Sequence, residues 1–179
     1  MKYLKSLLKE TIAVIIGILI ALFINNWNED RKDKEYLDQI YASIEKELEE
    51  SSLDLKRIIP RQLASVDTIN HYMNNDKVSL YEIILKADGI QKPLIKTNSW
   101  NSIASSKIEL MDYEKLSTLS DIVERKENLN QRIQQQMTYA FQNFEKTDKN
   151  KKVIYQMMII DIIGAEERLQ AVIDDLIKK

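Results

Sequence analysis

The side chains that could do chemistry are few in this chain of 179 residues. It has no Cys, which excludes disulfides, thiolate nucleophiles and cysteine-based zinc sites. Its one His is His71, so a metal motif with two His is impossible. Asp67 lies one helical turn before His71, but two ligands alone do not make a metal site, and this spacing is typical of a surface ion pair. The sequence predicts no metal site.

Other catalytic patterns are missing as well. The three Gly lie 72 or more residues apart, so neither Gly-rich nucleotide-binding motif can occur. A Ser–His–Asp triad would have to use His71, and no pattern places a Ser beside it. The net charge of −2 gives no electrostatic reason to expect nucleic acid. We therefore expect a protein that is not an enzyme, with no cofactor, no nucleic-acid partner and no small-molecule substrate that the sequence identifies.

An uncharged apolar segment is the strongest signal. Thr11–Ile24 reads TIAVIIGILIALFI, fourteen residues without a charge, which is about 21 Å of helix. Leu7–Trp27 is 21 residues long, and its length of about 31 Å matches a hydrocarbon core of roughly 30 Å. We expect four residues to lie at the membrane interfaces, namely Glu10, Asn25, Asn26 and Trp27.

Three other interpretations of this segment fit less well. A cleaved signal peptide needs small residues at a cleavage site, and Asn25–Asp30 offers none. A helix buried in a soluble protein would show a polar stripe, and a helix lying on the membrane surface would show a charged face. The sequence therefore favours a single-span anchor, with residues 1–27 as basic tail and membrane helix and residues 28–179 as a soluble bundle.

The orientation of the span rests on charge. Basic residues are balanced on its two sides, with Lys2, Lys5 and Lys9 before it and Arg31, Lys32 and Lys34 after it. The short tail, and the acidic residues Glu29, Asp30 and Asp33 that follow the span, favour a cytoplasmic N-terminus. We expect a single-pass protein of a bacterial inner membrane whose C-terminal bundle faces the periplasm.

Small residues recur every four positions within the span, at Ala13, Gly17 and Ala21. Such a row lets a second helix approach closely, which predicts self-association or contact with another membrane protein in the lipid bilayer. Glu10 lies seven residues before Gly17, near the same face. A carboxylate there leaves open a proton-coupled, stator-like role, which we favour less than an interfacial one.

The segment also carries a resemblance. Glu10, Val14–Leu22 and Ile24–Glu29 closely resemble the opening of an uncharacterised family of small single-span proteins common in Bacteroidota. A weaker likeness runs from Thr97 to Leu116, where Lys107 stands in place of the Gly that the family would show. The resemblance implies a bacterial envelope protein with a helical soluble part and no assigned activity.

The elements around these residues are predicted to be helices. Three Gly and two Pro are too few for the many turns of a β-fold. We expect an all-α chain, in which one transmembrane helix continues into an elongated antiparallel bundle of three long and two short helices. The long helices are expected at 28–74, with a heptad-like, coiled-coil seam that has gaps at Ser51 and Gln62, at 113–146, and from 152 onward. Pro60 should kink the first of them or begin a new helix. Ser79 and Glu82 should form a capping box that begins the first short helix, and Thr97 or Asn98 should cap the second.

The last helix carries more apolar residues than one core stripe needs. Its core stripe is predicted to include Ile154, Met158 and Ile162. A subunit contact is one interpretation of the surplus, and cover by the short helices is the other. The surplus residues are Met157, Ile159, Ile160 and Ile163.

The functional hypothesis is a membrane-anchored, non-enzymatic helical scaffold or accessory subunit of a bacterial envelope complex. An extracytoplasmic helical bundle that senses a ligand and signals through a partner is the alternative.

Overall fold

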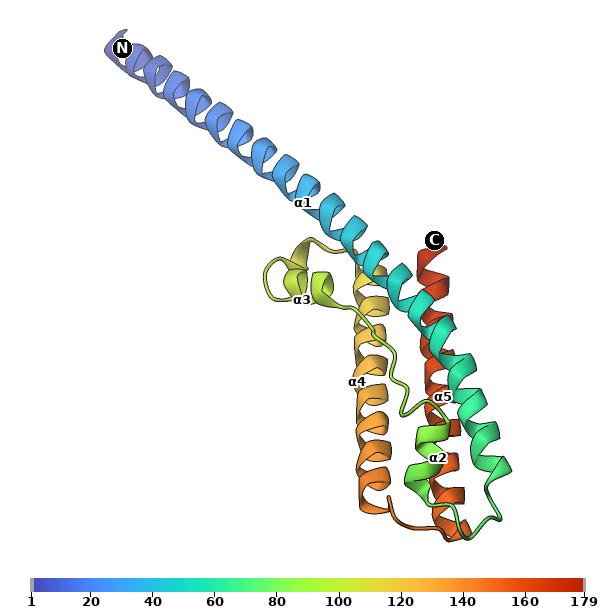
Figure 1. Ribbon diagram of the computed structural model, residues 1–179. Helices are drawn as coiled ribbons and strands as arrows, with labels where there is room; N and C mark the ends of the chain where they lie inside the picture. The colour runs from blue at the N-terminus through green and yellow to red at the C-terminus, as the bar shows by residue number, and fades with distance from the viewer. Residues whose placement is uncertain (1, 179) are drawn as a thin grey trace. The chain divides into compact units, whose positions relative to one another are not determined.

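The computed structural model describes the backbone of residues 2–178, and the side chains of residue 3 and residues 10–178. Over that range the chain is all-α, with three long and two short α-helices, as predicted (Figure 1). The side chains of Lys2, Lys5 and Lys9, used above to orient the span, lie outside the described residues. The elements are α1 Lys2–His71, α2 Leu80–Lys86, α3 Asn98–Ala104, the short 3-10 helix η1 Ile108–Leu110, α4 Tyr113–Gln142 and α5 Lys149–Ile177.

The chain divides into two compact units, Met1–Ala42 and Ser43–Lys179. The first unit is helical throughout its described part and belongs to α1. The second unit contains the rest of α1 and every other element. The boundary that we predict at residues 27 and 28 concerns the membrane, which the contacts within the chain do not address.

Helix α1 passes through Pro60 without a break. Proline has no amide hydrogen, so the carbonyl of Lys56 lacks its usual partner at this turn. Pro60 is exposed, where water can take the place of the missing donor. The alternative in which Pro60 begins a new helix is therefore wrong.

In the second unit, residues 43–71 of α1 contact α5 through hydrogen bonds of Ser52, Gln62 and Asn70, and α4 packs antiparallel to α5 (Figure 1). The apolar core includes Leu55, Ile122 and Ile162, one from each long helix. The connection from α2 to α3 follows α1, because the amide of Leu94 donates to Asp54 Oδ2 (2.7 Å) and that of Lys96 to Ser51 Oγ (2.9 Å).

Local signals place several helix ends correctly. Ser79 and Glu82 form the predicted capping box, with Ser79 N donating to Glu82 Oε2 (2.8 Å) and Glu82 N donating to Ser79 Oγ (3.2 Å). Asp112 caps α4, which begins at Tyr113 as predicted. Gly89 follows α2 at φ +81°, in the left-handed region that glycine tolerates best, and its amide donates to Ile84 O (2.9 Å).

The end of α4 and the start of α5, on either side of the turn that joins them, differ from the predicted bounds. Helix α4 ends at Gln142, four residues early, and α5 begins at Lys149, three residues early, with Asp148 as its cap. The physical reason is a contact with α2, whose residues lie far from this turn in the sequence. The carbonyls of Phe144 and Lys146 accept the amides of Tyr81 (3.0 Å) and Leu80 (2.9 Å), so this segment caps α2 instead of extending α4.

Replacing Leu55 with Ala tests which face of α1 is buried. Leu55 is 0% exposed, so the cavity should lower the free energy of unfolding by about 2–5 kcal/mol. Leu53→Ala is the matched control, because Leu53 is 66% exposed two residues earlier, and its effect should stay below about 0.5 kcal/mol. Denaturation of the full chain in detergent, followed by circular dichroism, measures both. Equal losses would contradict the assigned face.

Candidate functional site

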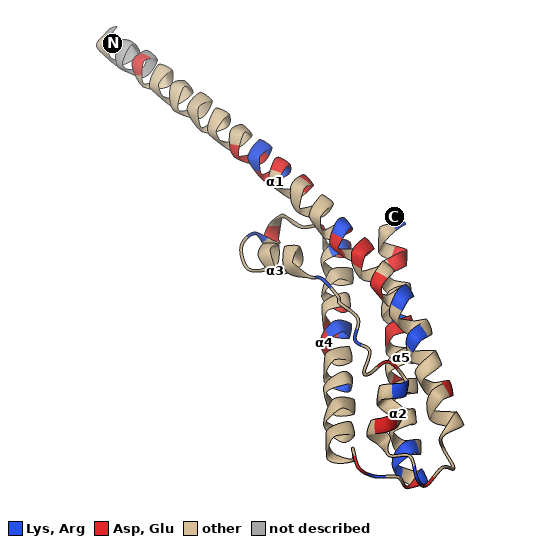
Figure 2. Cartoon of the chain, in the orientation of Figure 1, with Lys and Arg blue, Asp and Glu red and all other residues tan. Residues whose placement is uncertain are grey.

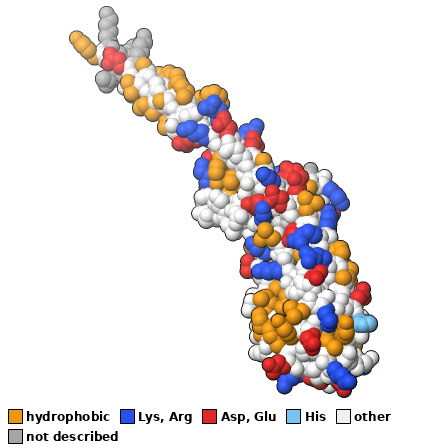
Figure 3. Space-filling view, viewed as in Figure 1, with side chains coloured by type: hydrophobic (Ala, Val, Ile, Leu, Met, Phe, Trp, Pro, Cys, Tyr) orange, Lys and Arg blue, Asp and Glu red, His pale blue; other side chains and the backbone are white. Residues whose placement is uncertain are grey.

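The apolar segment lies in α1, and none of its side chains is buried by the rest of the chain. Among the described residues, one helix is long and apolar enough to cross a membrane, and its best 18-residue window has a mean hydropathy of 1.8. Figure 2 shows this part of α1 as a ribbon without charges between Glu10 and Glu29, and Figure 3 shows hydrophobic side chains along it. A 0% buried apolar surface of this length fits contact with lipid.

The predicted interface residues lie at the two ends of this segment. Glu10, Asn25, Asn26 and Trp27 are all exposed. At the end that leads to the bundle, Asn25 Nδ2 donates to Glu29 Oε1 (3.3 Å) and Arg31 donates to Asn28 Oδ1 (3.3 Å). The change from apolar to hydrogen-bonded side chains within one turn is typical of a membrane interface.

The predicted packing face is uncovered in this chain. Ala13, Gly17 and Ala21 are exposed, and a methyl group built on Gly17 would have no heavy atom within 4 Å. The self-association of this face stays a prediction.

The four apolar residues predicted as a subunit contact divide into two pairs. Ile159 and Ile163 are buried inside the bundle, whereas Met157 and Ile160 are exposed. The core stripe of α5 agrees with the predicted one at Ile162 but is rotated in the first turns of the helix, since Ile154 is exposed and Tyr155 is buried. A second group of hydrophobic side chains gathers over α2 and the end of α4 (Figure 3). It includes Tyr81 and Phe141, both exposed, each with its ring against Phe144.

Polar side chains join α1 to α5 at several levels of the bundle. At one end, Ser52 donates to Asp174 Oδ1 and Lys56 pairs with Asp174 Oδ2 (3.2 Å). At the other end, Gln156 Nε2 donates to Asn70 Oδ1 (2.6 Å). Asp174 keeps a pKa below its ordinary value, because the bonds from Ser52 and Lys56 outweigh the opposing effect of partial burial.

Lys152 is fully buried at the end of this interface. Its Nζ donates to the carbonyls of Tyr72 (3.2 Å) and Asn75 (2.6 Å), the turn that follows α1. Burial lowers the pKa of this amine, and the carboxylates of Asp76, Asp148 and Glu82 oppose that shift. Lys152 therefore fixes the end of α1 onto the start of α5.

The most unusual pair lies in the middle of the interface. Gln62 is 4% exposed and Glu166 is 0% exposed, and Gln62 Nε2 donates to Glu166 Oε1 (2.9 Å). The remaining oxygens, Gln62 Oε1 and Glu166 Oε2, have no hydrogen-bond partner. Burial raises the pKa of Glu166 to about 7, Gln62 lowers it, and the carboxylates of Asp54 and Glu167 raise it further.

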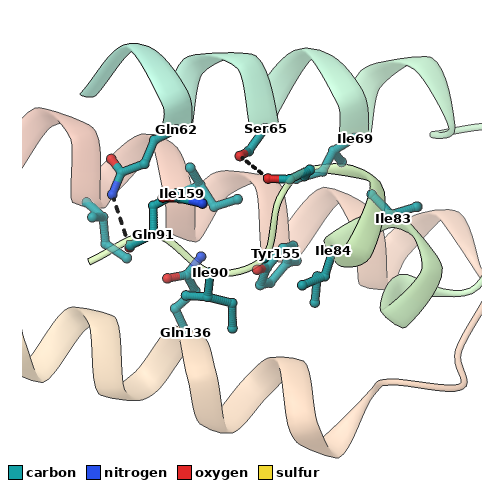
Figure 4. A pocket seen from close by; sticks show the side chains of 13 residues that line it. Gln62, Ser65, Ile69, Ile83, Ile84, Ile90, Gln91, Gln136, Tyr155 and Ile159 are labelled. Carbon is teal, nitrogen blue, oxygen red and sulfur yellow. Dashed lines mark hydrogen bonds between the residues drawn. The ribbon is translucent and has the colours of Figure 1, made fainter. Parts of the chain in front are cut away.

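A small cavity lies beside Gln62 (Figure 4). Its volume of about 10 Å³ leaves room for about one water molecule. Gln62, Gln136 and Tyr155 contribute polar atoms to its wall, and burial raises the pKa of the Tyr155 phenol. Ser65 Oγ, also on the wall, donates to Ala87 O (3.3 Å). An organic ligand does not fit there.

Asp161, a charged residue inside the apolar run of α5, pairs with Arg132 of α4. The described residues include no group of three or more His, Asp or Glu that could hold a metal, and Asp67 and His71 belong to none.

Sequence reasoning missed Glu166 and Lys152 as interior residues. A signal for them existed, because both lie at heptad spacing from Tyr155, Ile159 and Leu169, which are buried. The gaps in the α1 seam, Ser51 and Gln62, were also informative, since both are buried and bind partners across the bundle.

Comparison with known proteins gives one match. Residues 10–84 match the sequence model of a family described as a family of unknown function (DUF6090). The match includes the apolar segment and the remainder of α1, and it ends before the second likeness at residues 97–116. No curated protein and no solved structure matches the chain.

Proposed function

We propose that this chain is a membrane-anchored helical scaffold or accessory subunit of a bacterial envelope complex, without catalytic activity of its own. The observation that carries the proposal is that α1 contributes both the unburied apolar segment and, from Ser43 to His71, one long helix of the bundle. A single helix with both parts connects the bundle to the anchor.

The small cavity beside Gln62 supports a structural role over ligand sensing, whereas the larger cleft of about 290 Å³ between α4 and α5 is open to solvent. The cavity beside Gln62 has a volume of only about 10 Å³, far below the roughly 300 Å³ of a ligand pocket. The exposed surface supports contact with a protein partner, because four large apolar side chains remain available there. They are Met157 and Ile160 on α5, and Tyr81 and Phe141 at the end of the bundle.

Two lysines in the apolar segment should abolish membrane retention. The double substitution Ile16→Lys with Leu19→Lys places two charges near the middle of the span, at a cost of about 2.5–3.5 kcal/mol each. We expect the unaltered chain to stay with membranes after alkaline carbonate washing and the variant to appear in the supernatant. Met157→Lys with Ile160→Lys, on the bundle, is the matched control and should stay in the pellet. Retention of the first variant would contradict a transmembrane anchor.

The proposed orientation predicts the fate of a tag placed after Lys179. With the bundle in the periplasm, protease should remove the tag once the outer membrane is opened, and a cytoplasmic marker protein should survive. Digestion only after the inner membrane is opened would reverse the orientation and leave the anchor itself intact.

Gly17→Leu tests association of the span with a second copy. The larger side chain fills the groove beside Ala13 and Ala21, so the signal in a membrane two-hybrid assay should fall. Ile18→Leu, on a neighbouring face of the same helix, is the control and should keep the signal. An unchanged signal in the Gly17 variant would argue that this face contacts lipid alone.

A further inference from the structure

Two buried oxygens between α1 and α5 lack hydrogen-bond partners, and they belong to side chains already in contact. Gln62 donates one hydrogen bond to Glu166, through Nε2 and Oε1 at 2.9 Å. The second oxygen of each group, Gln62 Oε1 and Glu166 Oε2, is left unsatisfied. Buried polar atoms in folded proteins are nearly always paired, so this double exception calls for a specific cause.

The chemistry of the two atoms restricts that cause. Both are acceptors, and an amide oxygen can never become a donor. The missing component must therefore carry a donor hydrogen or a positive charge. A proton on Glu166 Oε2 supplies the donor, because a carboxylic acid and a primary amide can form two parallel hydrogen bonds, N–H to O and O–H to O.

We propose that Glu166 and Gln62 form a proton-binding site between α5 and α1, in which Oε2 of Glu166 carries the proton and donates it in a hydrogen bond to Oε1 of Gln62. Binding the proton neutralises the carboxylate and satisfies both acceptors at once. Releasing it to solvent leaves a buried charge and one hydrogen bond in place of two. The site is independent of the membrane anchor proposed above.

The charged groups around the pair do not supply a counter-charge to Glu166. On α1 the nearby carboxylate is Asp54, which is bound by Arg57, and on α5 it is Glu167. Both carboxylates disfavour a negative charge on Glu166. On α4, Arg125 is bound to Asp121 and Lys126 to Thr97. The connecting segment contributes the carbonyl of Gln91, 3.4 Å from Gln62 Nε2. Among the described residues, Glu166 has no ion-pair partner.

The pH dependence follows from the direction of the pKa shift. Burial raises the folded-state pKa of Glu166 to about 7, above the ordinary 4.5. The folded state thus holds the proton more tightly than the unfolded state, and the resulting stability is fully present below pH 4.5 and is lost as the pH rises through 7. The folding equilibrium constant should fall by at most about 300-fold over this range.

Glu166→Gln tests the site in the full chain, held in detergent micelles. The variant keeps the shape and supplies a permanent N–H donor to Gln62 Oε1. We expect its melting temperature at pH 8 to exceed that of the unaltered chain, and its melting temperature to fall less between pH 5 and pH 8. Infrared spectra at pH 6 should show the C=O stretch of a protonated carboxyl group that is missing in the variant. Asp175→Asn, an exposed carboxylate later in α5, is the matched control and should retain both properties.

Other outcomes would overturn the proposal. Without a protonated carboxyl band, melting temperatures at pH 8 that change between sodium and choline chloride would assign the site to a cation. The same missing band with no salt effect, and with equal pH dependence in Glu166→Gln, would assign it to a water bridging two acceptors. If Glu166→Gln does not fold, Gln62→Leu replaces it. This variant removes two hydrogen bonds from the protonated form and one from the ionised form, so the midpoint of the band should change, and an unmoved midpoint would contradict the pairing.

Discussion

The contact between α1 and α5 is the constraint on which the second unit depends. Helix α1 offers a seam whose apolar residues, such as Leu55, are interrupted by buried polar ones. A buried polar group is tolerated only where a partner stands opposite, so each interruption fixes where α5 must lie. Gln62 requires Glu166, and the turn that follows α1 is held by Lys152. A slide of one helical turn would leave these groups unpaired, which an all-apolar seam would not penalise.

The same contact explains which features the sequence could predict. Helix starts at Ser79 and Asp112 depend on side chains within three residues, so local patterns identify them. The end of α4 depends on α2, whose amides use the carbonyls of Phe144 and Lys146. A pattern read along the chain contains no information on a partner more than sixty residues away.

The buried face of α5 was harder to predict for another reason. Its first half is apolar on nearly all sides, so periodicity alone cannot choose between the stripe of Ile154 and that of Tyr155. The choice is made by Lys152 and Glu166, which find acceptors and donors on α1 and its following turn. Polar residues are usually assigned to the protein surface, but in α5 Lys152 and Glu166 lie on the buried face. The apolar segment at Thr11–Ile24 needed no such partner, which is why the sequence alone predicted it.

The long separation of these partners also sets the order of events during synthesis. The hydrogen-bond partners of Ser52, Gln62 and Asn70 lie 122, 104 and 86 positions later in the chain, so they are synthesised later. At translation rates of about 5–20 residues per second, that delay is roughly 5–20 seconds. The apolar segment leaves the ribosome long before α5 exists, so insertion of the anchor that we propose would precede completion of the bundle. During that interval the seam of α1 is uncovered, and a cell that makes this protein must keep the half-finished face away from other chains.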